Sequence, residues 1–196
     1  MQSICCRLKT FVLVVMVGIA GGLTSARAAE ATAFQLVKKG NDYVGKDCRD
    51  KVVQIRSEKS IASLTPTVWY VVYYDADAAF KATEVKFGAG EKLKVSRPWR
   101  MLEPVTGGNK MLDKDKLKTD SDAAIRMATA EPLLKPLKLT ATQLWLEHSD
   151  EGPVWKVRLW ASKLSNPMKS VDVGDVFVSA ETGKVTRSDL HIDRVD

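Results

Sequence analysis

The most informative stretch of this 196-residue sequence reads Gly152-Pro153-Val154-Trp155-Lys156-Val157-Arg158-Leu159. Successive side chains of a β-strand point to opposite faces, so Trp155, Val157 and Leu159 share one face. The other face carries Lys156, Arg158 and then Trp160. A strand with one apolar face and one face of cations and aromatics is typical of an antiparallel sheet that meets water on one side. We therefore expect Trp155 to lie in the core.

The same layout occurs earlier in the chain. The stretch in question reads Pro66-Thr67-Val68-Trp69-Tyr70-Val71-Val72-Tyr73, and its Val-Trp pair precedes the second one by 86 residues. A shorter candidate strand comes before each stretch, at residues 52–56 and 143–148, and a further run that ends at a glycine turn follows each one. A segment with helical spacing of apolar residues opens each copy. The sequence therefore predicts the same supersecondary unit twice.

A helix followed by antiparallel strands, twice over, predicts an α+β fold. We expect two tandem helix-plus-antiparallel-strand units, with the helices packed on one face of a curved antiparallel sheet. The first unit spans residues 29–97 and the second spans residues 119–196. Residues 98–118 contain two prolines, a Gly-Gly pair and a charge-rich stretch, and we interpret them as a linker.

Residues 1–28 have the three parts of a secretory signal peptide. Arg7 and Lys9 form the charged start, a charge-free apolar run occupies residues 11–23, and Ala26-Arg27-Ala28 is a small-x-small cleavage pattern. We expect a mature protein that begins at Ala29 and is periplasmic or secreted. No later apolar stretch is long enough to cross a bilayer, so we expect no integral membrane segment after cleavage.

Charge and cysteine content limit the partners of the mature chain. Removal of residues 1–28 takes away three basic residues and no acidic one, which leaves 27 basic against 24 acidic residues. That balance does not favour nucleic acid, because nucleic-acid-binding domains carry a much stronger basic stripe. Cys48 is the single cysteine that remains. It cannot form an intramolecular disulfide, so it either pairs with another chain or stays a free thiol.

The second unit contains an alanine-rich helical segment at residues 122–130, the triplet Trp155-Lys156-Val157, and a terminal hairpin that reads Val176-Phe177-Val178-Ser179-Ala180-Glu181-Thr182-Gly183-Lys184-Val185. In these features it resembles the PepSY domain, a small extracytoplasmic module also found in propeptides of secreted metallopeptidases. The resemblance covers residues 118–190 well and the first unit weakly. It implies protein binding or peptidase inhibition, and no reaction is known for these motif residues.

Signatures of catalysis are absent from the sequence. The two histidines, His148 and His191, do not belong to a spacing that binds metal. The sequence has no Gly-x-Ser-x-Gly elbow, no phosphate-binding glycine loop and no dinucleotide fingerprint. We therefore predict no catalytic residue, no metal site and no cofactor, and we do not expect an enzyme.

Three classes of function remain. The leading hypothesis is a noncatalytic extracytoplasmic module that binds or inhibits a peptidase or another envelope protein, with a protein or peptide held on the outward face of the sheet. Aromatic and arginine side chains are enriched at binding hot spots. On that basis the candidate binding face comprises Tyr70, Tyr74, Lys156, Arg158 and Trp160.

Two other classes are ranked lower, and the candidate face has a simpler interpretation. A small-ligand carrier would need an apolar pocket between sheet and helices, lined by Trp69, Trp145 or Trp155. A hydrolase is third, because no nucleophile and base can be paired. Alternatively, the outward side chains merely cover the sheet or pack beneath the linker.

Overall fold

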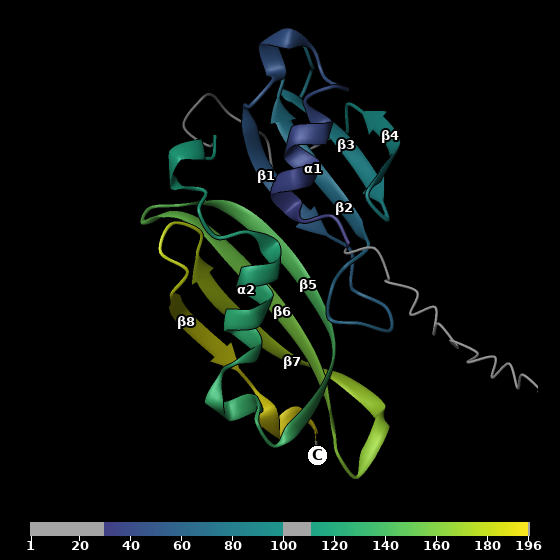
Figure 1. Ribbon diagram of the computed structural model, residues 1–196, viewed down its shortest axis with the longest axis vertical. Helices are drawn as coiled ribbons and strands as arrows, with labels where there is room; N and C mark the ends of the chain where they lie inside the picture. Colours follow the sequence, from purple (N-terminus) through teal and green to yellow (C-terminus); the bar gives the residue numbers. More distant parts are fainter. Residues whose placement is uncertain (1–29, 100–110, 196) are drawn as a thin grey trace, which may run out of the picture.

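The computed structural model describes residues 30–99 and 111–195 (Figure 1). The expected signal peptide, residues 1–28, lies outside the described residues, and so does the central part of the expected linker, residues 100–110. The first elements in chain order are α1 (Ala33–Gly40), η1 (Lys46–Cys48), β1 (Val52–Ser57), β2 (Val68–Tyr74), β3 (Ala82–Gly88) and β4 (Glu91–Ser96). After residue 110 come η3 (Lys114–Lys116), α2 (Ser121–Thr129), η4 (Pro132–Leu134), β5 (Leu137–Ser149), β6 (Gly152–Lys163), β7 (Asn166–Ser179), β8 (Val185–Leu190) and η5 (Ile192–Val195).

All eight strands of the described residues belong to one antiparallel sheet, in the order β4-β3-β2-β1-β5-β6-β7-β8. The predicted architecture, two tandem helix-plus-strand units with helices packed on one face of a curved sheet, is therefore wrong. Strand accounts for 46% of the described residues and helix for 19%. The two α-helices have only eight and nine residues, whereas β5, β6 and β7 have twelve to fourteen.

The pairing of β1 with β5 explains why the chain does not divide into separate units. These strands are antiparallel neighbours, with Gln54 opposite Glu147, Ile55 opposite Leu146 and Arg56 opposite Trp145. Without this pairing each strand would be an edge with unpaired backbone groups. The ladder pairs the backbone groups of β1 with those of β5. The sheet is therefore continuous across the expected boundary between the two units.

The core lies on one side of this sheet and draws on both halves of the sequence. Trp69 and Trp155 are both buried in it, as the strand alternation predicts, and each indole N–H donates to a backbone carbonyl, of Pro66 at 2.9 Å and of Thr119 at 2.8 Å. The ring of Phe34 in α1 lies 6.2 Å from that of Trp155, centroid to centroid. The buried hydrophobic side chains of α1, α2, η1, η4 and η5 all belong to the same core cluster.

The helices are positioned by a few specific contacts. At Gly40 a Cβ atom would lie 2.1 Å from the Tyr73 hydroxyl oxygen, so the helix approaches β2 closely only because glycine stands there. The N-termini of α1 and α2 meet at Asp120, whose Oδ1 accepts hydrogen bonds from the backbone N–H groups of Phe34 and Ser121. Within residues 30–99 and 111–195, no helix is long and apolar enough to cross a membrane.

Candidate functional site

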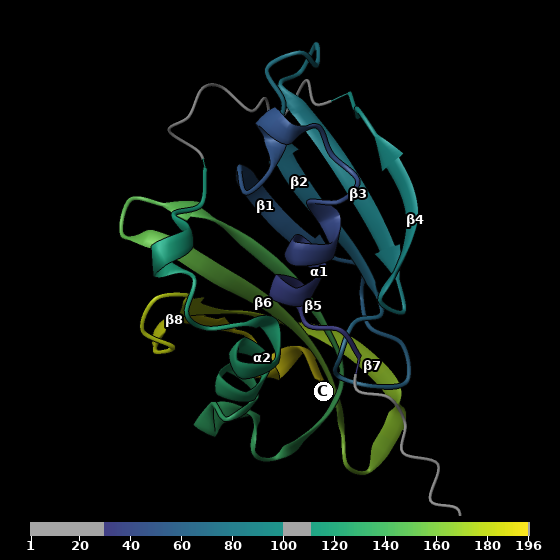
Figure 2. The ribbon, with the colours of Figure 1, turned by 45° about the horizontal axis from the view of Figure 1, so that its top comes forward.

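We call the side of the sheet opposite Trp69 and Trp155 the open face. The buried hydrophobic side chains of the helices belong to the core on the other side of the sheet (Figure 2). One register position on the open face can be followed through the ladders of all eight strands. From β4 to β8 this cross-strand row consists of Lys94, Lys86, Tyr70, Arg56, Trp145, Lys156, Phe177 and Arg187.

Cations and aromatic rings contact each other along this row. The Arg56 guanidinium lies 3.9 Å from the centroid of the Tyr70 ring, and the Lys86 ammonium lies 4.9 Å from the same centroid. The Arg187 guanidinium lies 3.9 Å from the ring of Phe177. These distances are within the range of cation–π attraction. The rings are therefore partly covered by cations of the protein itself.

On β1 to β3, carboxylates form ion pairs with the cations of the row. Arg56 forms an ion pair of 2.7 Å with Glu84, and Lys86 forms one of 3.0 Å with Glu58. The Tyr70 hydroxyl also donates to Glu58. The hydrogen bond from Tyr70, followed by that from Lys86, lowers the pKa of Glu58. Glu58 is therefore held in its ionised form, and the positive charges on this part of the face are balanced.

A second network surrounds Asp175 on β7. Arg158 donates two hydrogen bonds to its carboxylate, of 2.9 Å from Nε and 3.0 Å from a terminal guanidinium nitrogen. The Lys156 ammonium nitrogen lies 3.3 Å from Oδ2 of the same carboxylate. Burial acts to raise the pKa of Asp175, but the Arg158 hydrogen bonds and the charge of Lys156 outweigh it, so the pKa is lowered. Two-point binding of this kind fixes the guanidinium plane. It holds Arg158 with its guanidinium carbon 5.8 Å from the centroid of the Trp145 ring.

The five residues of the predicted binding face all lie on the open side of their strands, but they do not form one cluster. Lys156 and Arg158 lie together around Asp175. Tyr70 is separated from Lys156 by β1 and β5. Tyr74 packs on a small buried cluster of Val53, Val72 and Ala82. The Lys59 ammonium lies 4.3 Å from the centroid of the Trp160 ring.

Several members of the cross-strand row were not identified from the sequence. The row contains Arg56, Trp145, Phe177 and Arg187. Of these four, the sequence predicts a binding role only for Trp145, as a residue lining an apolar pocket. Alternation could have identified Phe177, because its neighbours Val176 and Val178 are fully buried. Arg56 and Trp145 required knowledge of the β1–β5 register, which no local pattern provides.

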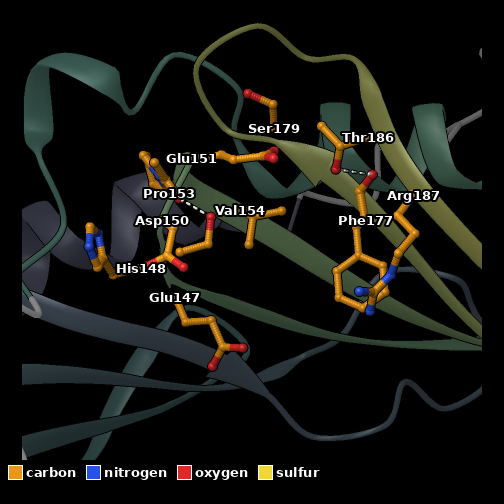
Figure 3. Close-up of a pocket in the computed structure, with 12 residues that line it drawn as sticks. Glu147, His148, Asp150, Glu151, Pro153, Val154, Phe177, Ser179, Thr186 and Arg187 are labelled. Carbon is orange, nitrogen blue, oxygen red and sulfur yellow. Dashed lines mark hydrogen bonds between the residues drawn. The ribbon is translucent and has the colours of Figure 1, made fainter.

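The open face is hollowed at one end, beside the turn between β5 and β6 (Figure 3). The hollow has a volume of about 480 Å³. Phe177 and Arg187 form one wall, with the guanidinium beside the ring, and Glu147 lies on the other side. Trp69 and Trp155 are buried on the opposite side of the sheet from Trp145. These three tryptophans therefore do not line a common cavity.

Cys48 lies in a second hollow of about 400 Å³, next to Asp75. Its side chain is buried, and burial, together with the nearby Asp75 carboxylate, raises the pKa of the thiol. A thiol with a raised pKa is a poor nucleophile at neutral pH. Within the described parts of the chain, no group of three or more His, Cys, Asp or Glu side chains is placed to hold a metal ion.

Comparison with known proteins identified no relative of this chain. No protein-family model, curated protein or solved structure matches the chain. The resemblance to PepSY domains therefore rests on the motif residues alone.

Proposed function

We propose that this chain is a noncatalytic binding module that holds a protein or peptide on its open face. The observation that carries the proposal is the cross-strand row of cationic and aromatic side chains, which runs through all eight strands. At the usual strand spacing the row is about 34 Å long. That length suits a protein surface, since one partner in a standard interface contributes about 800 Å².

The charge pattern of the open face supports a protein partner over a polyanion. Arg56, Lys86 and Arg158 each have a carboxylate partner on the same face, so the surface alternates in sign. Nucleic acid selects a basic stripe instead. Rings covered by cations are also less accessible for stacking on bases or sugars. Arginine, tyrosine and tryptophan are the side chains enriched at protein-binding hot spots.

The proposed compartment is the periplasm or the cell exterior. Residues 1–28 support export, and the resemblance of residues 118–190 to PepSY domains supports a peptidase or another envelope protein as the partner. Intact-mass measurement of exported material should give a chain that starts within a residue or two of Ala29. Recovery of the chain with residues 1–28 still attached, in the membrane fraction, would refute this part of the proposal.

Capture from an envelope extract tests the binding face. The wild-type protein is compared with the double variant Tyr70→Ala/Trp145→Ala, which removes two rings from the row. The matched control is Phe80→Ala/Trp99→Ala, which removes a stacked aromatic pair outside the row, with centroids 5.4 Å apart. We expect the row variant to lose the captured partner while the control keeps it, with both variants folded by circular dichroism. Equal capture by both would contradict the proposal.

A further inference from the structure

The β6–β7 hairpin ends in an exposed apolar tip. Leu164 and Met168 have 70% and 91% of their surface exposed, among the highest values for large apolar side chains in the described residues. Figures 1 and 2 both show this hairpin projecting from the lower end of the molecule. We call residues 163–169 the hairpin tip. Exposed apolar side chains that gather at one projection mark an interaction site.

The loop between β1 and β2 lies beside this hairpin in both views. It is anchored to β5 by a hydrogen bond of 2.8 Å from Ser60 N–H to the Thr142 carbonyl, and to β6 by the Lys59–Trp160 contact. Ile61 in this loop is 83% exposed. Ile61 directly follows Lys59 and Ser60, which contact Trp160 of β6 and Thr142 of β5, so the loop adds a third exposed apolar side chain close to these strands.

Lysines lie in the segments that carry these apolar side chains and in the neighbouring start of β5. These segments contain no acidic residues. The first residue of β5, Leu137, pairs with Lys163, so the start of β5 lies against the hairpin. Segments 59–68, 132–140 and 161–171 contain no Asp or Glu. Their exposed cations are Lys59, Lys135, Lys138, Lys163 and Lys169.

We propose that the hairpin tip and its neighbours dock on a membrane surface that contains anionic lipids. Apolar side chains beside several lysines are the residue pattern of interfacial binding, in which apolar groups enter the headgroup region and cations meet lipid phosphates. A protein partner fits less well, because the hairpin tip has neither arginine nor an aromatic side chain, the types enriched at protein-binding hot spots. The open face, by contrast, has mixed charges. This proposal is therefore independent of the binding role of the cross-strand row.

Co-sedimentation with lipid vesicles tests the proposal. The probe is the chain without residues 1–28, since that apolar segment would itself bind lipid and all described elements follow residue 29. We expect binding to phosphatidylcholine vesicles that contain phosphatidylglycerol and little binding to phosphatidylcholine alone. Lys163→Gln/Lys169→Gln should weaken binding by about fivefold per lysine. Leu164→Ser/Met168→Ser should weaken it as well, with the thermal midpoint unchanged because these side chains are exposed.

The matched control is Lys114→Gln/Lys116→Gln, which removes the same charge from η3, near the opposite end of β6 at Gly152. We expect this control to bind mixed vesicles like the wild type. Equal losses in the η3 and tip variants would show attraction by net charge and would overturn the proposal. Absence of wild-type binding to mixed vesicles would also overturn it, and would leave a protein as the partner of the tip.

Discussion

Arg56 of β1 lies directly opposite Trp145 of β5, in the ladder that joins the first four strands to the last four. Both side chains point to the open face, whereas their neighbours Ile55 and Leu146 are fully buried. A register slip of one residue would move Arg56 into the core and Ile55 into water. The β1–β5 register therefore determines both the continuity of the core and the continuity of the cross-strand row.

Two buried serines extend this junction where the strands diverge. The Ser57 hydroxyl accepts from the Leu144 N–H at 2.9 Å, and the Ser60 hydroxyl accepts from the Thr142 N–H at 2.9 Å. Ser57→Ala or Ser60→Ala should each lower the free energy of unfolding by about 1–3 kcal/mol, because a buried N–H loses its acceptor. Urea unfolding measures the change. Ser165→Ala, at an exposed turn position, is the control, and a loss of similar size there would contradict this explanation.

The junction also predicts how the chain unfolds. A fragment of residues 117–196 leaves β5 as an unpaired edge and uncovers the part of the core shared with β1. We expect this fragment to be weakly folded or to dimerise, while the chain from Ala29 unfolds in a single transition. Calorimetry and sedimentation measure both properties. Two separate transitions of the whole chain, reproduced by the isolated halves, would show that the halves are independent.

The local parts of this fold could be predicted from the sequence, and the long-range part could not. Alternation around Trp69 and Trp155 correctly placed both tryptophans in the core, but it did not predict that Val72, on the opposite face of β2, is also fully buried. The β1–β5 pairing joins residues about 90 positions apart, and the residues near it contain no signal that names the partner strand. The composition of residues 98–118 suggested a boundary between two units. The hydrogen bonds between β1 and β5 cross that boundary, and this is why the two-unit architecture was wrong.

Trp155 should be a strong determinant of stability. Its side chain is fully buried, and its indole N–H donates to the Thr119 carbonyl. Trp155→Ala should lower the free energy of unfolding by about 3–5 kcal/mol, because it leaves a large cavity and an unpaired carbonyl. Trp99→Ala removes a side chain that is 74% exposed and stacks on Phe80, so it should lower the free energy of unfolding by only about 1 kcal/mol. Comparable losses at the two positions would contradict the assigned core.

Asp175 should make stability depend on pH in the acid range. Its pKa in the folded protein lies below the ordinary value of 3.8, so its ion pairs stabilise the fold above that pH. The stabilisation is lost as pH falls through the folded pKa, because the carboxylate becomes protonated. Asp175→Asn should therefore be less stable than wild type at pH 7, and the difference should shrink below about pH 4. Urea unfolding across this range measures it, and a pH-independent difference would contradict the ion-pair network.

The candidate site was predicted less completely than the core. Alternation correctly placed Tyr70, Lys156 and Arg158 on the side of the sheet opposite Trp69 and Trp155, since the position in a strand determines the side. It could not show that Arg158 is held by Asp175 or that Tyr74 packs on the buried cluster of Val53, Val72 and Ala82. Those contacts depend on cross-strand register and on chain segments that return from a distance. Arg158 is consequently a poor residue to delete in a binding test, because its loss would leave Asp175 without its main partner.

Hydroxyl-radical footprinting of the protein with and without its captured partner tests the binding face most directly. The method measures the oxidation of individual aromatic side chains, so Tyr70, Trp145 and Phe177 report on the row and Trp99 reports on a surface outside it. We predict that the partner protects the three row residues and leaves Trp99 unchanged. Unchanged oxidation of Trp145 and Phe177 in the complex, with protection elsewhere, would contradict the assignment of the open face as the binding surface.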